Sequence, residues 1–394
     1  MKKCKLKDLI EVTRGASLAG EFYSTEGELV RLTLGNFDYE NGGFKINTSK
    51  DDIYFTGEVK DEFILNEGDI ITPLTEQAIG LLGTTAKIPE SGKYIQSQDV
   101  ALVKCNEEID PAYCYYLLPS NIVKKQLSAG AQQTSIRHTS PDKIKDCWVY
   151  ILEKEDQKKV ASFLDIIENK ISINREMNVT LDKMAKQLYD YWFVQFDFPN
   201  KEGNPYKTSG GKMVYNEYLK REIPEGWRVL QAGEICNIKT GKEDANFATP
   251  DGKYPFFTCS RSTSFCDTPA FDAKAILLAG NGDLNVKHYT GKFNAYQRTY
   301  VIEPKDSLYW GALYQSTLNF LDVLKRRSNG AIIKFITIGD VNGLTVFEQP
   351  DKQIYERLNR IFDQIEHNEL EILRLTALKN HLSPLLLNGQ IKIN

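Results

Sequence analysis

The stretch of sequence that decides the fold occurs twice. Its first copy is EDQKKVASFLDIIENKISINREMNVTLDKMAKQLYDYWF at residues 155–193, and its second copy is DKQIYERLNRIFDQIEHNELEILRLTALKNHLSPLLL at residues 351–387. When Val160 is placed over Ile354, apolar residues coincide at alternating steps of four and three, and Asn174 coincides with Asn368. This spacing predicts two long helices with a coiled-coil seam, and a repeat of roughly 200 residues predicts two related domains rather than a solenoid.

The predicted seam occupies equivalent positions of the two helices. A buried Asn costs stability but fixes the register of two helices, so the matched Asn174 and Asn368 favour a coiled-coil seam. The alternative, which stays open, is two ordinary amphipathic helices inside one globular core. The two helices can run antiparallel to each other. Each has about 33 residues and therefore spans roughly 50 Å, which is somewhat more than one turn of B-DNA. The seam residues are Leu164, Ile167, Ile171, Asn174, Leu181 and Leu188, then Leu358, Ile361, Ile365, Asn368, Leu375 and Leu382.

The rest of the sequence predicts an α+β fold with two similar mixed α/β domains and a pseudo-twofold internal repeat. Each globular stretch alternates short strand-like runs with turns and contains one predicted helix, over residues 111–127 and about 308–325. The Pro-, Gly- and Asn-rich segment between them indicates a connection. We therefore expect a first domain (1–152), a first spacer helix (153–196), a linker (197–226), a second domain (227–350), and a second spacer helix with a C-terminal tail (351–394).

The composition limits the possible functions. The formal net charge is −4, and only the second globular stretch leans basic, which does not suggest a simple nucleic-acid binder. The seven cysteines are scattered and form no C-x-x-C pair, which favours reduced thiols over a disulfide framework or a zinc site. We find no signal peptide and no apolar run of roughly 20 residues, so we expect a soluble, cytoplasmic protein.

Several motifs resemble one known family, the DNA-specificity subunits of Type I restriction–modification systems. The segment LDKMAKQLYDYWFV at 181–194 looks like the end of that family's first spacer helix. The segments SGGKMV at 209–214 and IPEGW at 223–227 look like the entry to its second recognition domain. The segment LSPLLLNGQ at 382–390 looks like its C-terminal end, and Gln157 and Gln353 match a recurrent position near the helix starts.

The resemblance covers essentially the whole chain and implies a function. It implies two target-recognition domains that each read one half of an interrupted double-stranded DNA target. It also implies that the spacer helices, through the seam region, dock two modification subunits, which bind S-adenosylmethionine and methylate adenine. A restriction subunit that uses ATP and Mg²⁺ joins this complex in the family. Two departures stand out, namely Pro350 before the second helix and Lys379 within its apolar stripe.

The residues themselves do not predict catalysis, a metal or a bound cofactor in this chain. The nearest approach to a methyltransferase tetrad is Asn204-Pro205-Tyr206, which lacks one Pro. The nearest approach to a dinucleotide-binding motif is Gly280-Asn281-Gly282, which lacks the third Gly. A carboxylate–metal nuclease needs Pro-Asp followed by an acidic-x-Lys triplet. Pro250-Asp251 with Asp272-Ala273-Lys274, and Pro141-Asp142 with Glu168-Asn169-Lys170, fit that pattern. Patterns this short arise often by chance, and the second places its Lys on a long helix.

Candidate DNA contacts are polar and basic residues in loops near strand ends. Arg and Lys suit guanine or phosphate, whereas Asn and Gln suit adenine. The alternative for each residue is that it is simply a polar, solvent-exposed loop residue. His138 and His288 can be packed turn residues, and residues 325–327 can be the basic C-terminus of an ordinary helix. The candidates are Arg14, Gln77, Gln96, Gln98, Gln132, Gln133, Arg137 and His138 in the first domain. In the second they are Lys239, Lys242, Arg261, Asn281, Lys287, His288, Arg298, Lys325, Arg326, Arg327 and Lys334.

Three other functions remain open at this point. The first is the separate recognition polypeptide of a related two-part restriction enzyme that cuts outside its site. The second is a coiled-coil adaptor that joins two protein-binding domains, and the third is an autonomous nuclease built on Asp272. Enrichment of an interrupted DNA motif distinguishes the specificity subunit from the adaptor and the nuclease.

Overall fold

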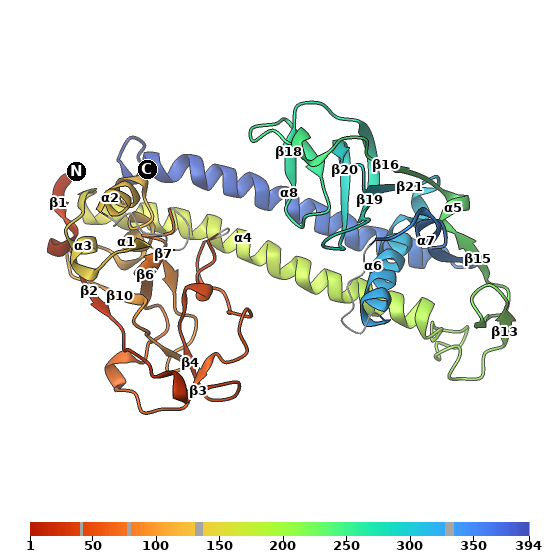
Figure 1. Cartoon of the computed structure of the whole chain (residues 1–394), viewed down its shortest axis with the longest axis horizontal. Helices are drawn as coiled ribbons and strands as arrows, with labels where there is room; N and C mark the ends of the chain where they lie inside the picture. The colour runs from red at the N-terminus through yellow and green to blue at the C-terminus, as the bar shows by residue number, and fades with distance from the viewer. Residues whose placement is uncertain (40–41, 77–79, 131–136, 328–334, 394) are drawn as a thin grey trace. The chain divides into compact units, whose positions relative to one another are not determined.

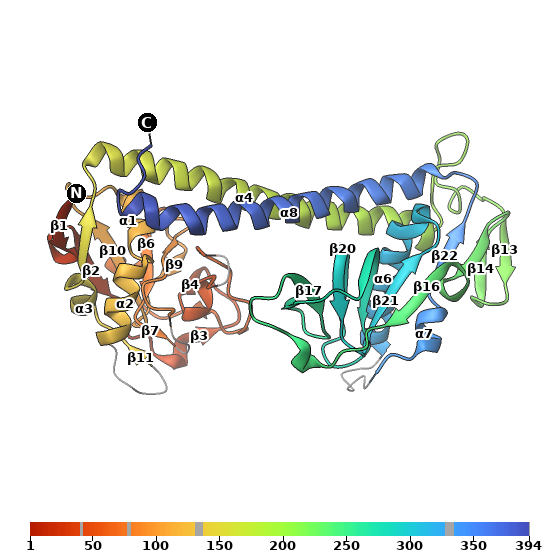
Figure 2. The same cartoon turned by 90° about the horizontal axis from the view of Figure 1, so that it is seen from above.

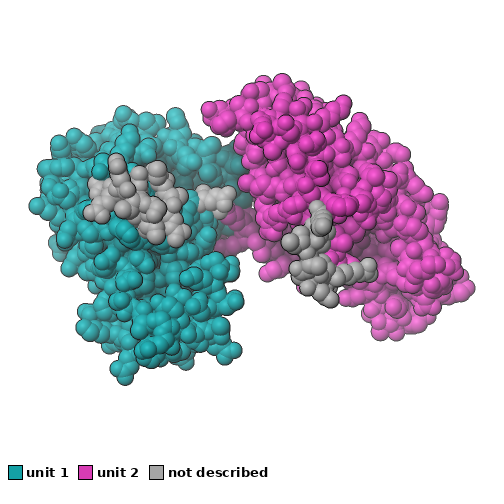
Figure 3. Space-filling model, in the orientation of Figure 1, with its two compact units in different colours: residues 1–172, 372–394 teal, residues 173–371 magenta. Residues whose placement is uncertain are grey.

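The computed structural model describes residues 1–39, 42–76, 80–130, 137–327 and 335–393, without the side chains of 130, 137 and 325–327. The chain forms two compact units, coloured separately in Figure 3. Unit 1 comprises residues 1–172 and 372–394, and unit 2 comprises residues 173–371. The division falls inside the two long helices, so each unit contains one globular domain together with part of both helices. None of the helices in the described part of the chain carries an apolar stretch of the length that a lipid bilayer requires.

The two predicted long helices are present as α4 (Lys154–Tyr189) and α8 (Gln353–Leu387). The first turn of α4 contains two acidic residues, which suit a helix N-terminus, and the helix leads into a π-type turn over Asp190–Val194. In each unit the two helices lie side by side and run antiparallel (Figures 1 and 2). Val160 and Leu164 share the core of unit 1 with Leu386, whereas Tyr189 shares the core of unit 2 with Ile354. The predicted antiparallel coiled coil is confirmed.

The polar residues of the seam pair across the helices, and each of the matched asparagines donates a hydrogen bond to a different residue of the facing helix. Asn174 Nδ2 donates to Glu371 Oε2 at 2.8 Å, and Asn368 Nδ2 donates to Asn178 Oδ1 at 2.8 Å. The two asparagines are buried, as are Leu164, Ile167, Ile171, Leu358 and Ile365, while Leu181, Leu188, Ile361, Leu375 and Leu382 are half-buried. Lys379, which interrupts the stripe, is an ion-pair partner of Glu168. Asn174, Asn368 and Lys379 therefore each have a partner on the facing helix.

The first domain is built on an antiparallel sheet. In spatial order its strands are β2 (Ile10–Arg14), β10 (Val100–Cys105), β6 (Ile70–Pro73) and β8 (Ala86–Lys87). A second sheet orders β3 (Tyr23–Ser24), β5 (Tyr54–Phe55), β4 (Leu29–Arg31) and β9 (Tyr94–Ile95). Two further pairs are β1 (Lys2–Lys5) with β12 (Trp148–Ile151) and β7 (Thr75–Glu76) with β11 (Arg137–His138). The helices are α1 (Pro111–Leu117), α2 (Asn121–Gly130) and α3 (Pro141–Lys145).

One helix prediction in this domain was wrong. The sequence predicts a single helix over residues 111–127, but the structure has α1 and α2 with a break that contains Pro119. Proline has no N–H to donate and its ring collides with the preceding turn, so the helix stops and a second one starts. The predicted start is confirmed, because the Asp110 side chain caps α1 by accepting from the Tyr113 N–H at 3.1 Å.

The second domain repeats this arrangement. Its sheet orders β16 (Cys236–Thr240), β21 (Thr299–Pro304), β19 (Phe271–Ala279), β20 (Val286–Ala295), β17 (Tyr254–Phe257) and β18 (Ser264–Cys266). β15 (Arg228–Gln231) pairs with β22 (Thr345–Glu348), and the helices are α5 (Ala232–Ile235), α6 (Trp310–Arg327) and α7 (Ile338–Asn342). The linker contains a hairpin, β13 (Met213–Asn216) with β14 (Arg221–Pro224), rather than only a connection.

The two domains share one topology, which establishes the predicted internal repeat. The order β2-β10-β6-β8 in the first corresponds to β16-β21-β19-β20 in the second. In each domain a helical segment follows the second strand of this order, and a short helix, α3 or α7, precedes the strand that leads into the long helix. The first and last strands of each domain pair antiparallel, as β1–β12 and as β15–β22.

Candidate nucleic-acid interface

Four segments of the first domain meet where its central strands end. Three backbone hydrogen bonds hold them together. The Ala16 N–H donates to the Gln96 carbonyl at 3.0 Å, the Leu74 N–H to the Asp99 carbonyl at 2.8 Å, and the Thr139 N–H to the Leu74 carbonyl at 2.8 Å. We call this the first strand-end site, and its described segments are residues 14–16, 74–76, 96–99 and 137–139.

The second domain builds the same frame. The Gly241 N–H donates to the Thr299 carbonyl at 3.3 Å, the Gly280 N–H to the Arg298 carbonyl at 2.8 Å, and the Ile336 N–H to the Gly280 carbonyl at 2.8 Å. These bonds join the segments that correspond to those of the first domain. The second strand-end site comprises residues 240–243, 258–262, 280–285, 296–299 and 335–336.

A glycine lies at the same place in both sites. A Cβ on Gly15 would stand 2.2 Å from the Gln96 carbonyl oxygen, and a Cβ on Gly241 would stand 1.8 Å from the Ala295 carbonyl oxygen. Real Cβ atoms essentially never approach closer than 3.0 Å, so only glycine lets the end of the first strand pass this close to the facing loop. Neither glycine was predicted from the sequence, although the Arg14-Gly15 and Thr240-Gly241 pairs lie at the ends of predicted strands.

The first site brings several predicted residues together. Arg14 Nε donates to the Gln98 carbonyl at 2.9 Å, and both of these side chains are exposed, as is that of His138. Arg137 pairs through its backbone with Glu76, but its side chain lies outside the described part. The predicted residues Gln77, Gln132 and Gln133 also lie outside the described residues.

Gln96 requires a correction. Its side chain is 1% exposed, and its Nε2 donates to the Thr13 carbonyl at 2.7 Å and to the Val100 carbonyl at 3.0 Å. The amide hydrogens are therefore engaged within the domain, and Gln96 positions the loop instead of facing a ligand. Gln98, two residues further, has the exposure that a base contact needs.

The second site collects a larger polar and basic group. Asn281 Oδ1 accepts from the Cys259 thiol at 3.0 Å, and Arg261 Nε donates to Asp283 Oδ2 at 2.7 Å. Lys287 Nζ donates to the Ser260 carbonyl, and burial lowers the pKa of this lysine. The predicted residues Lys242 and Arg298 are exposed on the adjoining segments, as is Gln297, which the sequence analysis did not select.

His288 also requires a correction. Its ring packs edge-on against Trp310, with centroids 5.4 Å apart, and against Tyr314 at 5.0 Å. Burial, and secondarily the Lys274 ammonium, lowers the pKa of His288 to about 4. The half-buried imidazole packs against two aromatic rings, which agrees with the alternative interpretation of His288 as a packing residue.

The remaining basic candidates lie elsewhere or are not described. Lys239 is exposed within β16, opposite Val301. Lys325, Arg326 and Arg327 end α6, but their side chains lie outside the described part of the chain, as does the whole of Lys334.

The nuclease-like pattern forms no metal site among the described residues, where no group of three His, Cys, Asp or Glu side chains is placed to bind a metal. Lys274 of that pattern pairs with Asp363 of α8 at 2.5 Å, and its ammonium lies 4.6 Å from the centre of the Trp310 ring. The lysine therefore ties the sheet to the long helix.

Both long helices expose apolar side chains. In unit 2, Ile173, Met177 and Met184 are exposed on α4 at steps of four and seven residues, which places them on one face of the helix. In unit 1, Leu373 and Leu378 of α8 are exposed. Exposed apolar residues at helical spacing are typical of a surface that a partner covers.

The chain is thus a two-domain α+β protein with a matched pair of polar sites on a repeated frame, and comparison with known proteins identifies its family. Residues 1–183 and 224–375 match the family model described as the Type I restriction modification DNA specificity domain, and the chain therefore belongs to this family.

Two relatives are similar in sequence. The Type I restriction enzyme EcoDI specificity subunit of Escherichia coli is 42% identical over 161 residues, which are 38% of this chain and 34% of that protein. The chain thus matches about a third of that relative's length. The MjaIX specificity subunit of Methanocaldococcus jannaschii is 22% identical over 309 residues, covering 71% of this chain and 69% of that protein.

A solved structure supports the fold. The S subunit of a Type I restriction–modification system from M. genitalium superposes with a TM-score of 0.63 over 98% of this chain and 96% of that chain. At 17% sequence identity this likeness bears on the fold alone.

Proposed function

We propose that this chain reads the two halves of an interrupted double-stranded DNA target, one half with each strand-end site. The observation that carries the proposal is the repetition of the same backbone frame with different side chains on it. A shared frame presents each loop set in the same way, whereas the differing side chains give each domain its own base preference.

The side chains of the two sites suit different half-sites. The first offers Arg14, Gln98 and His138, and the second offers Arg261, Asn281 and Arg298. Arginine pairs with the guanine edge, and Asn or Gln pairs with adenine, in two-point contacts worth about 1–3 kcal/mol of discrimination. The Arg261–Asp283 pair holds the guanidinium in place while leaving donors for a base or phosphate.

The catalytic steps belong to partner subunits in this proposal. Two copies of a modification subunit dock on the spacer helices, where the exposed apolar residues support such a contact, and they methylate adenine with S-adenosylmethionine. A restriction subunit brings ATP- and Mg²⁺-dependent translocation and cleavage. We assign no catalytic role and no bound cofactor to this chain, and we place the work of the complex in the cytoplasm.

We further infer that the helices set the gap between the half-sites. Helix α4 has 36 residues, which at about 1.5 Å each gives roughly 54 Å. One inserted heptad in both helices preserves the seam and adds about 10 Å, the rise of about three base pairs. We expect the target gap to lengthen accordingly while both half-sites stay the same, and an unchanged gap would contradict this role.

Selection from random duplex DNA tests the proposal. The chain, co-purified with its modification subunits, should enrich an interrupted motif. Changing Gln98→Ala should relax one half of that motif, and Arg261→Ala should relax the other. Lys50→Glu, an exposed change outside both sites, serves as the control. A single contiguous motif would refute the two-site reading, and enrichment of no DNA would favour a protein adaptor.

A further inference from the structure

The strand pair β1–β12 has an uncovered aromatic face. Val149 and Ile151 point into the core of unit 1, whereas Trp148 and Tyr150, on the opposite face of β12, are 45% and 43% exposed. Lys3 Nζ lies 5.0 Å from the centre of the Trp148 ring and 5.9 Å from that of Tyr150. We call Lys3, Lys5, Trp148 and Tyr150 the ribbon face.

The corresponding face in the second domain is covered by the chain itself. Tyr150 lies opposite Lys3 in β1–β12, and Phe347 has the same place in β15–β22, opposite Val229. Phe347 is only 3% exposed. Three aromatic rings from the end of α4 and the linker cover it, and an arginine lies 5.6 Å from its centre; the covering residues are Phe193, Phe196, Trp227 and Arg221.

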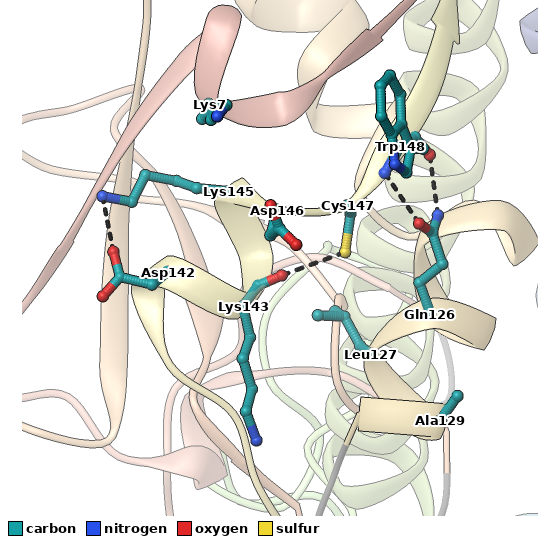
Figure 4. A pocket seen from close by; sticks show the side chains of 10 residues that line it. All are labelled: Lys7, Gln126, Leu127, Ala129, Asp142, Lys143, Lys145, Asp146, Cys147 and Trp148. Atoms are coloured by element: carbon teal, nitrogen blue, oxygen red, sulfur yellow. Dashed lines mark hydrogen bonds and ion pairs between the residues drawn. The ribbon is translucent and has the colours of Figure 1, made fainter.

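A cleft of about 740 Å³ continues the ribbon face beyond Trp148 (Figure 4). The Gln126 side chain holds the main chain of Trp148 in place. Its Nε2 donates to the Trp148 carbonyl and its Oε1 accepts from the Trp148 N–H, both at 2.8 Å. The cleft is lined by three lysines and two carboxylates, namely Lys7, Lys143, Lys145, Asp142 and Asp146. The ribbon face and the cleft together carry five lysines and two carboxylates, in a domain that is acidic overall.

We propose that the ribbon face and this cleft dock a segment of one modification subunit that presents aromatic and acidic side chains. The inference rests on the proposed function. The excess of lysines complements acidic groups. The corresponding face of β15–β22 is packed against aromatic rings, so a strand pair of this kind accommodates aromatic side chains on that face. Only two residues separate Ile151 of β12 from Lys154 of α4, so a subunit on this end of the helix reaches the face directly.

The covered counterpart favours a protein occupant over DNA. Asp142 pairs with Lys145 at 3.0 Å, and Asp146 pairs with Lys5, so part of the positive charge is already neutralised. Phosphate binding depends on charge, whereas exposed, positioned aromatic rings are typical of protein interface hot spots. Because the chain covers its own counterpart face, one of the two modification subunits has a contact that the other lacks.

Native mass spectrometry of the complex co-expressed with its modification subunits tests this inference. The wild-type chain should carry two modification subunits. The Trp148→Ala/Tyr150→Ala double variant should lose one copy, with its dissociation constant raised at least tenfold, and Lys3→Glu should weaken the same copy. Matched controls are Phe22→Ala, whose ring is 42% exposed, and Lys50→Glu; both should keep two copies.

Each other outcome has a distinct meaning. Two copies retained at wild-type affinity in the double variant and in Lys3→Glu would overturn the inference. Weakened DNA binding with unchanged subunit stoichiometry would also overturn it and would assign the face to DNA. If the wild-type chain bound no modification subunit, the proposed function would fail together with the inference.

Discussion

Replacing Gly15 by alanine should damage the first strand-end site selectively. The new Cβ would stand 2.2 Å from the Gln96 carbonyl oxygen and 2.5 Å from that of Ser97, so the facing loop must withdraw by at least 0.8 Å to reach 3.0 Å. That movement strains the hydrogen bonds from Ala16 and from the Gln96 side chain. Overpacking of this kind costs about 1–3 kcal/mol of folding free energy.

The effect on recognition should exceed the effect on stability. Displacing Gln98 and Arg14 by nearly an ångström removes base contacts worth about 1–3 kcal/mol each, which is roughly a 5- to 150-fold loss of affinity. Competition binding with duplexes altered in one half-site or the other measures this loss. Gly15→Ala should abolish discrimination at one half only, and Gly241→Ala should abolish it at the other half.

Two glycine substitutions without a clash serve as controls. A Cβ on Gly20 meets nothing closer than 3.9 Å, and one on Gly339 nothing closer than 3.5 Å, so Gly20→Ala and Gly339→Ala should bind as wild type. If Gly15→Ala kept wild-type discrimination at both half-sites, the strand-end frame would not be the reading surface, and the reasoning would be refuted.

Three further changes test other parts of the structure. Lys379→Met should lower the free energy of unfolding by about 1–2 kcal/mol in chemical denaturation, because it leaves the largely buried Glu168 carboxylate without its cation. Adding Glu168→Gln should recover part of this loss, whereas a single variant more stable than the wild type would contradict the prediction. Asn368→Ala should destabilise by about 1–2 kcal/mol, since it leaves Gln364 without its acceptor and removes the donor to Asn178; an unchanged unfolding midpoint would show that the seam does not depend on this network. The pKa of His288 is about 4 in the folded chain and about 6.5 in the unfolded chain, so the free energy of unfolding should fall as the pH drops from 6.5 towards 4. His288→Phe should make this fall smaller. Equal pH dependence of the melting temperature in the variant and the wild type would contradict the prediction.

The sequence predicted those parts of the fold that depend on periodicity. The 4–3 spacing from Val160 and from Ile354 was sufficient to place both helices, because a long amphipathic helix is determined locally. The split at Pro119 was also a local signal, and it was overlooked. The linker hairpin could not be predicted, because its side chains pack against parts of the chain that are distant in sequence. Ile223 is buried in the core of unit 2, and Arg221 lies over the Phe347 ring.

The candidate sites were predictable only as regions. Arg14, Gln98, Asn281 and Arg298 lie in loops at strand ends, as the sequence predicts, and their contact with DNA stays a prediction. The sequence could not distinguish Gln96 from Gln98, because their difference comes from carbonyl acceptors at Thr13 and Val100 that only the folded loop brings near. The partners of the seam asparagines depended in the same way on how the helices align.

Methylation mapping tests the central claim most directly. Genomic DNA from cells that express the chain with its modification subunits is sequenced at single-molecule resolution, for the wild type and for the Gln98→Ala and Arg261→Ala variants. We predict one interrupted methylated motif for the wild type, with Gln98→Ala relaxing only one half and Arg261→Ala only the other. A contiguous motif, or variants that each alter both halves, would contradict two independent readers on a repeated frame.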